Sequence, residues 1–271
     1  MNGKEFSNAL AARRHVYGTC HISTSPNWSA ALAGAGLDFV FIDTEHTAID
    51  RTTVAWLSRI YRSLNLAPMV RIPAPDPYQA SMVIDGGAEA VLAPYIETVE
   101  QVRRLAGPLK YRPLKGERLE RALDDPSTLE PELAAYLQQR NAGLSLLINI
   151  ESIPGIEALD DILATGFVDG VVIGPHDLSC SLGIPEQYNH PRFEEAVRTI
   201  IGKCDARAVS AGLHTIWDAI PRQIEWARLG ANILLHSVDL FLFRRALTED
   251  LTKLKTALGD DPAGGVRSFN V

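Results

Sequence analysis

The feature that most constrains the fold of this sequence is a regular alternation between short apolar runs and longer amphipathic segments. The short runs are rich in Val, Ile, Leu and Phe, as in strands buried on both faces, and the longer segments carry apolar residues at helical spacing. Eight candidate strands cover residues 16–23, 37–43, 67–72, 88–94, 144–150, 168–173, 209–214 and 232–236. The alternation therefore predicts eight successive βα units.

Local signals support helices between these strands. Asp50 is placed to cap one helix, and Thr98 with Gln101 forms a capping box for another, while Pro191 stands where a first helical residue is expected. Eight such units over about 250 residues predict a (β/α)₈ TIM barrel, with an open doubly wound sheet as the alternative. Neither a G-x-G-x-x-G motif after the first strand nor a Walker A sequence is present, so the barrel is favoured.

Composition excludes several classes of function. The chain has 271 residues, a formal net charge of −7 and an isoelectric point near 5.5, so it is not expected to bind nucleic acid or a membrane surface. Its three cysteines lack C-x-x-C spacing, which argues against a disulfide framework or a zinc knuckle. No signal segment or run of roughly 20 apolar residues occurs. We expect a cytoplasmic protein.

Two segments depart from the simple alternation. Residues 109–143 form a long charged connection between the fourth and fifth strands, with a helix expected over 131–140. This connection either shapes a substrate site or is a solvated, charged excursion. The last helix, over residues 238–258, has an apolar face wide enough to serve both barrel packing and a subunit contact. We expect one barrel domain over 1–258 and a mobile tail over 259–271.

Polar residues cluster where the predicted strands end. The reacting groups of barrel enzymes lie at the carboxyl ends of strands, and a charge buried there needs a partner or a metal. The candidates are Asp43, Glu45 and His46 after the second strand, Arg71 after the third, Asn149 and Glu151 at the fifth, Gly174, His176 and Asp177 after the sixth, and His21, His214 and His236 at the first, seventh and eighth.

Two of these carboxylates suggest a metal site. Glu151 and Asp177 follow different strands, and two converging carboxylates suit a hard divalent cation such as Mg²⁺ or Mn²⁺. The alternative is a surface carboxylate and an unrelated helix cap. No lysine stands at a strand end, so an imine mechanism is not expected.

The remaining charged residues suggest acid–base chemistry. His46 is placed to act as a general base, with Asp43 or Glu45 fixing its tautomer, and a purely structural histidine is the alternative. Arg71 is placed to hold a developing oxyanion, and a buried ion pair with a neighbouring carboxylate is the alternative.

These strand ends fall into motifs that resemble a known family, the HpcH/HpaI family of metal-dependent, class II pyruvate aldolases. The motifs are Phe41-Ile42-Asp43-Thr44-Glu45-His46, Val70-Arg71-Ile72-Pro73, and Ile150-Glu151-Ser152 followed by Ile173-Gly174-Pro175-His176-Asp177-Leu178-Ser179. The resemblance covers roughly residues 5–255 in order. It implies a TIM barrel of the phosphoenolpyruvate/pyruvate type and a homohexamer in which subunits exchange their last helices in pairs.

The resemblance also implies roles for individual residues. Glu151 and Asp177 would bind a divalent metal cation (Mg²⁺, Mn²⁺ or Co²⁺). His46, oriented by Asp43, would be the acid/base through a bound water, and Arg71 would hold the keto or enolate oxygen.

Further implied roles concern the substrate carboxylate and a neighbouring subunit. The backbone N–H groups of His176 and Asp177, in the loop that begins at Gly174, would receive the carboxylate. Asp85 would reach toward the Asp43 and His46 pair of an adjacent subunit.

The reaction implied by the resemblance is the reversible cleavage of a 4-hydroxy-2-oxo acid to pyruvate and an aldehyde. One alternative is a Claisen-type or decarboxylating lyase acting on oxaloacetate or a related 2-oxo acid at the same site. Another is a barrel that binds a carboxylate metabolite without catalysis.

The chain departs from the family pattern around the pocket. Cys20-His21 stands where many members have an aromatic residue, Lys115-Gly116-Glu117-Arg118-Leu119-Glu120 stands in place of a Gly-rich segment, and His176 replaces a small residue. Because the metal and base motifs are intact, these departures predict an unusual aldehyde rather than a different reaction.

Overall fold

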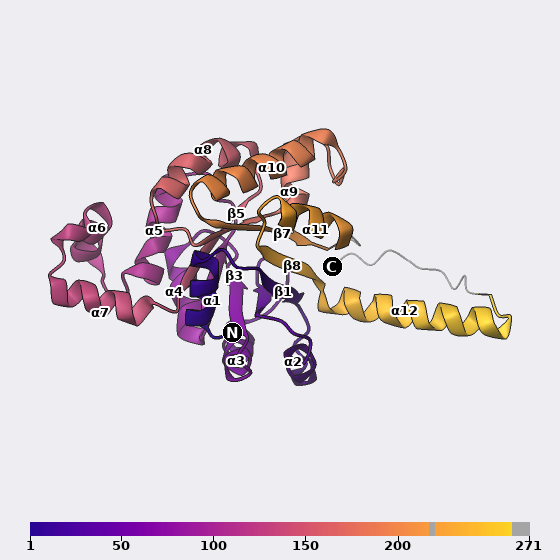
Figure 1. The fold of residues 1–271 in the computed structure, drawn as a ribbon. Helices are drawn as coiled ribbons and strands as arrows, with labels where there is room; N and C mark the ends of the chain where they lie inside the picture. Colours follow the sequence, from indigo (N-terminus) through magenta and orange to yellow (C-terminus); the bar gives the residue numbers. More distant parts are fainter. Residues whose placement is uncertain (217–219, 262–271) are drawn as a thin grey trace.

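The chain folds into a closed barrel of eight parallel strands, seen in a computed structural model that describes residues 1–216 and 220–261 (Figure 1). The strands pair in chain order, and the last pairs with the first. They are β1 (Val16–His21), β2 (Phe39–Asp43), β3 (Ala67–Arg71), β4 (Ala90–Ala93), β5 (Ser145–Ile150), β6 (Gly170–Ile173), β7 (Ser210–Thr215) and β8 (Ile233–Val238). The predicted barrel is confirmed, and each strand end lies within about two residues of its expected position.

Helices surround the barrel and begin at the caps that the sequence indicates. Asp50 accepts a hydrogen bond from the Thr53 N–H, and both halves of the capping box between Thr98 and Gln101 are formed. The helices are α1 (Gly3–Ala11), α2 (Pro26–Ala33), α3 (Arg51–Ser63), α4 (Pro77–Gly86), α5 (Val99–Lys110), α8 (Ile153–Ala164), α9 (Pro175–Ser181), α10 (Pro191–Ala206) and α11 (Ile220–Arg228). Most of these helices cover the outer faces of the strands, whereas α1 packs Phe6 against the inward-facing Phe39.

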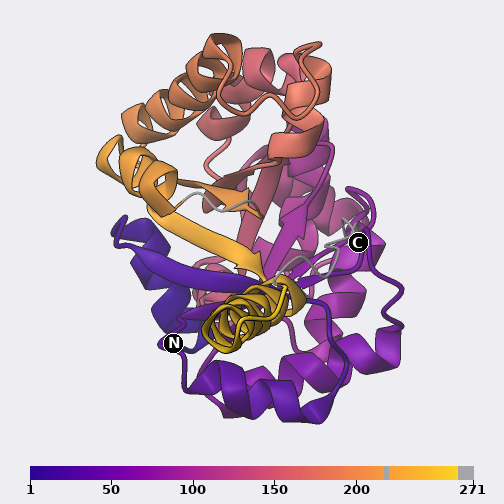
Figure 2. The ribbon, with the colours of Figure 1, turned by 90° about the vertical axis from the view of Figure 1, so that its right-hand side faces the viewer.

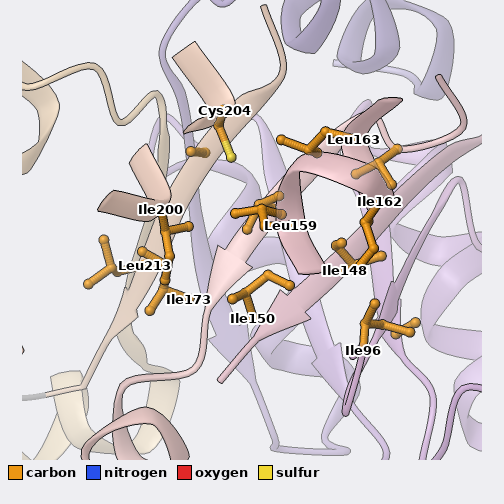
Figure 3. Packing of buried hydrophobic residues seen from close by; sticks show 14 of the residues in the cluster. Ile96, Ile148, Ile150, Leu159, Ile162, Leu163, Ile173, Ile200, Cys204 and Leu213 are labelled. Carbon is orange, nitrogen blue, oxygen red and sulfur yellow. The ribbon is translucent and has the colours of Figure 1, made fainter. Parts of the chain in front are cut away.

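The core has two layers because each strand buries both of its faces. Outward side chains such as Ile148 and Ile150 of β5 pack with Leu159 and Ile162 of α8 and with Ile200 of α10 (Figure 3). Inward side chains fill the barrel itself; they include Phe39, Phe41, Met69, Leu92, Leu147, Val172 and Leu235. This filled interior leaves space only at the ends of the strands.

The long connection between β4 and β5 lies at the opposite end of the barrel from the carboxyl ends of the strands. It follows α5 and leads into β5, so it joins the starts of strands; it contains α6 (Gly116–Asp124), a 3₁₀ turn (Pro126–Thr128) and α7 (Pro131–Asn141). Lys110 Nζ lies 2.5 Å from Asp169 Oδ2, just before β6. The predicted helix is confirmed, and no residue of the connection is among those that line the cavity at the carboxyl ends of the strands. The segment is not a bare excursion either, since Tyr111, Ala122 and Leu137 share a small core.

The last helix, α12 (Asp239–Leu258), extends away from the barrel as a rod (Figures 1 and 2). Within it only Asp239 is buried. Its exposed apolar residues are Phe243, Leu247, Leu251, Leu254 and Leu258. The predicted barrel packing occurs at the start of the helix, where Phe241 packs against the inner core, and residues 262–271 of the predicted tail lie outside the described part of the chain. Across residues 1–216 and 220–261, no helix has the length and apolar character to cross a membrane.

Candidate active site

A cavity of about 660 Å³ lies where the strands of the barrel end. Its walls combine polar strand-end residues with apolar side chains from the barrel interior. The predicted residues on its walls are Asp43, His46, Arg71, Asn149, Gly174, His176, Asp177 and His214, accompanied by Cys20, Phe41, Val172 and Leu235. The fold thus brings together side chains from all eight strands, which are far apart in the sequence.

Arg71 joins two carboxylates of the β2 motif. Its Nε and Nη2 atoms lie 2.9 and 2.6 Å from the two oxygens of Asp43, and Nη1 lies 3.0 Å from Glu45 Oε2. Burial would raise the pKa of Asp43, but the hydrogen bonds and charge of Arg71 outweigh burial and lower it below its ordinary value. Asp43 is therefore a fixed carboxylate that holds the arginine fork in one orientation.

His46 lies at the cavity mouth with 56% of its side chain exposed. Its Nε2 is 3.6 Å from Glu45 Oε1, whereas both oxygens of Asp43 are bound by Arg71. Of the two carboxylates that the sequence offered as partners for His46, the one that faces the imidazole is Glu45. The exposed ring retains the freedom to approach a bound substrate directly or through a water.

Glu151 follows β5 and is only 5% exposed. The Tyr95 N–H donates to Oε1 at 2.7 Å, and a Cβ on Gly174 would lie 2.5 Å from Oε2, so residue 174 must be glycine for the carboxylate to sit there. Burial raises the pKa of Glu151 to about 7, and the negative charges of Asp177 and Glu45 add to this, whereas the hydrogen bond from Tyr95 opposes it. The site therefore holds carboxylates that repel one another.

This arrangement fits a hard divalent cation. Glu151 and Asp177 offer only oxygen ligands, and a cation between them would relieve the repulsion that now disfavours their joint ionisation. No group of three or more His, Cys, Asp or Glu side chains able to hold a metal occurs within residues 1–216 and 220–261. The remaining ligands would be waters and substrate oxygens, as is usual for Mg²⁺.

Tyr95 is a site residue that sequence reasoning missed. It follows β4 with φ = 55°, a left-handed conformation that is unusual for a residue other than glycine. Its N–H binds Glu151, and interaction of its hydroxyl with the Glu45 carboxylate raises the pKa of Tyr95 to about 12. Tyr95 thus connects the carboxylate of the β2 motif with that of β5. The amino-acid sequence around Tyr95 does not indicate a backbone turn of this kind, so sequence analysis could not have identified it.

Three other candidates lie away from the site or at its edge. His21 is fully buried, with Nδ1 3.0 Å from Asp239 Oδ2, and it anchors the start of α12 rather than facing the cavity. Asp85 is exposed on α4 and pairs with Arg112; its predicted reach into a neighbouring subunit stays a prediction. His176 is at the mouth, 57% exposed, with Nδ1 3.7 Å from a Glu186 oxygen.

A closed parallel barrel with carboxylates, an arginine and a histidine gathered at the carboxyl ends of its strands defines a TIM-barrel enzyme. Comparison with known proteins gives the family. Residues 20–246 match the family model described as HpcH/HpaI aldolase/citrate lyase, so the chain belongs to this family and is a carbon–carbon lyase.

Individual relatives cover nearly the whole chain. The chain is 30% identical to a hydroxypyruvate/pyruvate aldolase from Roseovarius nubinhibens over 93% of this chain and 96% of the relative. It is 29% identical to a 5-keto-4-deoxy-D-glucarate aldolase from Escherichia coli over 91% and 96%. The crystal structure of an HpcH/HpaI aldolase from Desulfitobacterium hafniense DCB-2 superposes with a TM-score of 0.78 at 28% identity, covering 97% of this chain and 98% of that one.

Proposed function

We propose that this protein is a divalent-metal-dependent aldolase that reversibly cleaves a 4-hydroxy-2-oxo acid into pyruvate, or a substituted pyruvate, and an aldehyde. The observation that carries the proposal is that the Glu151 carboxylate interacts electrostatically with Asp177 and Arg71, which both line the cavity at this barrel end. The family and the named aldolases among its relatives support the same reaction type.

Glu151 and Asp177 would hold the cation. When bound, a divalent cation supplies Lewis-acid polarisation of the carboxylate and keto oxygens of a 2-oxo acid. The backbone N–H groups of His176 and Asp177, in the loop that begins at Gly174, would receive the substrate carboxylate.

Arg71 stabilises the charge that develops during bond cleavage. In the cleavage direction the C4 hydroxyl loses its proton, the C3–C4 bond breaks to release the aldehyde, and its electron pair moves into the enolate of the 2-oxo acid. The guanidinium is already fixed by Asp43 and Glu45, so it needs little reorganisation to hold the enolate oxygen. Protonation at C3 then gives the free 2-oxo acid.

His46 is the base that accepts the proton of the C4 hydroxyl, directly or through a water. The neighbouring Glu45 carboxylate would stabilise the imidazolium that forms. In the synthetic direction the same imidazolium returns the proton to the new alkoxide.

The metal requirement is tested with Glu151→Gln and Asp177→Asn. Both are expected to abolish cleavage and synthesis, because a neutral amide is a poor ligand for a hard cation, while far-UV circular dichroism stays unchanged. Chelation by EDTA is expected to stop the wild type, and Mg²⁺, Mn²⁺ or Co²⁺ to restore it. Glu97→Gln, an exposed carboxylate at the same barrel end, is the control and should keep full activity. Wild-type turnover that persists in EDTA would contradict the proposal.

The base is tested with His46→Ala. Loss of general base catalysis should lower kcat by about 10² or more, with little loss of stability because the side chain is largely exposed. Steady-state rates are measured with pyruvate and a panel of aldehydes, and with oxaloacetate. An unchanged rate would exclude His46 as the base, and activity on oxaloacetate alone would replace the aldol reaction with a decarboxylating or Claisen-type one.

A further inference from the structure

His214 is a polar cavity residue to which the proposed reaction assigns no role. It ends β7, and its ring meets the Phe41 ring edge-on at 5.5 Å between centroids. The Arg71 guanidinium lies over the same Phe41 ring, 5.5 Å from its centroid. His214 and Arg71 therefore flank one side chain on the cavity floor, whereas His46 and His176 stand at the exposed mouth.

A bulge in the barrel fixes which ring nitrogen of His214 carries the proton. The register between β1 and β8 shifts beside Ser237, which adopts φ = 55°. The Ser237 carbonyl oxygen is 3.1 Å from His214 Nε2. A carbonyl oxygen only accepts hydrogen bonds, so Nε2 carries the hydrogen, and Nδ1 of a neutral ring keeps its lone pair.

The surroundings of the His214 ring favour its neutral form. Burial lowers the pKa of His214 to about 4, and the positive charge of Arg71 contributes, although the hydrogen bond with Ser237 and the charge of Asp43 oppose the shift. A neutral imidazole whose Nε2 is already engaged is suited to accept one hydrogen bond at Nδ1. It is a poor general acid and carries no charge to attract a carboxylate.

We infer that His214 is a specificity-determining residue whose Nδ1 accepts a hydrogen bond from a hydroxyl on C3 of the 2-oxo acid bound at Arg71. The nucleophilic substrate would then be a 3-hydroxy-2-oxo acid rather than pyruvate itself. This inference rests on the proposed function, which places the keto oxygen at Arg71. C1 and C3 are both bonded to the keto carbon. Because the proposed function assigns the C1 carboxylate to the loop that begins at Gly174, a substituent on C3 is the part of the substrate left to meet a group beside Arg71.

The methyl group of pyruvate makes no use of such an acceptor. Phe41, Val172 and Leu235 already line the cavity with apolar surface. A methyl group at C3 needs only such apolar contacts, and another apolar residue at position 214 would provide them as well as histidine does. An acceptor that meets only a methyl group stays unpaired once water is expelled, which costs binding free energy. The hydroxylated substrate removes that cost.

The test compares hydroxypyruvate with pyruvate in the wild type, His214→Phe and His214→Gln. Phe keeps a ring against Phe41 but removes the acceptor, and Gln retains a donor and an acceptor. Dissociation constants are measured in Mg²⁺ or Mn²⁺ by calorimetry. Exchange of the C3 protons with D₂O, followed by NMR, reports enolate formation without an aldehyde.

We expect the wild type to favour hydroxypyruvate, and His214→Phe to weaken its binding and slow its exchange by about tenfold while pyruvate changes little. His214→Gln should recover part of the loss.

Equal losses for both acids would show a structural role, and a wild type that favours pyruvate or binds neither acid would overturn the inference. If the two variants misfold, the wild-type preference still decides it. Selective binding without any aldol cleavage would refute the proposed function and leave this ligand assignment standing.

Discussion

Arg71 supplies the positive charge shared by the carboxylates of the β2 motif. Its guanidinium contacts Asp43 and Glu45, and it also acts on Glu151, whose charge is repelled by Asp177. This end of the barrel therefore combines one arginine with four carboxylates. Such an excess of negative charge in a partly buried site is costly unless protons or a cation neutralise it, and this imbalance favours a divalent ion as part of the working site.

His214 gives a pH prediction at the same scale. Its pKa is lowered from 6.5 in the unfolded chain to about 4 in the folded one, so between these values the unfolded state binds more protons. Its contribution to stability is complete above pH 6.5 and is lost as the pH falls toward 4. The loss should reach at most about 3 kcal/mol, and His214→Phe should abolish this part of the pH dependence. Urea unfolding at pH 4.5, 5.5 and 7 measures it, with the exposed His15→Gln as control. Parallel curves for wild type and His214→Phe would contradict the assigned shift.

The sequence was sufficient to identify the principal site residues, but it did not show which of these side chains contact one another. Charged residues directly after buried strands identified Asp43, Arg71, Glu151 and Asp177, because such charges need partners. The partner of His46 was ambiguous between Asp43 and Glu45, since both are within reach along the chain. Tyr95 was missed, as its contribution depends on a left-handed backbone turn that tyrosine rarely adopts.

At the scale of elements, the ends of β5 and β6 determine the carboxylate site. Gly174 leaves β6 and packs against Glu151, whose oxygen occupies the volume that a Cβ would need. Gly174→Ala should displace the Glu151 carboxylate and weaken Mn²⁺ binding by about tenfold or more, as expected when the support of a metal ligand is disturbed. Calorimetric titration with Mn²⁺ measures this.

Gly202→Ala is the matched control for that variant. Gly202 lies in α10, where an added Cβ meets nothing within 4 Å, so alanine should leave Mn²⁺ affinity unchanged and favour the helix slightly. Equal Mn²⁺ affinities for the two variants would show that close packing at Gly174 does not position Glu151.

The positions of strands and helices could be predicted from the sequence more readily than the roles of the segments that connect them. Doubly buried strands and capped helices leave strong local patterns, so the barrel was predictable. The connection over residues 109–143 was assessed by its length and its many charged residues, which do not reveal the end of the barrel at which it lies. Chain order decides that point: a segment that leads from a helix into a strand returns to the starts of the strands, away from the site.

At the scale of the whole molecule, α12 is the feature that a single copy leaves unexplained. Its start is tied to the barrel by Asp239, which accepts hydrogen bonds from the Ser23 and Leu240 N–H groups and lies beside His21. Farther along the helix, from Phe243 to Leu258, the large apolar residues Phe243, Leu247, Leu251, Leu254 and Leu258 are exposed. An exposed apolar stripe of this length is typical of a surface that another protein covers. We therefore propose that α12 packs on a second copy of the chain, within the hexamer implied by the family resemblance.

Replacing Leu251 and Leu254 together by Asp tests this assembly. The wild type is expected to sediment as an oligomer, and the double variant as a smaller species, because two charges would have to be buried in the contact. The barrel should stay folded, since neither leucine belongs to its core. Lys253→Glu changes charge on an exposed residue of the same helix and should leave the oligomer intact. Sedimentation velocity at several protein concentrations measures the outcome. A monomeric wild type, or an oligomer that survives the double substitution, would show that this helix has another use.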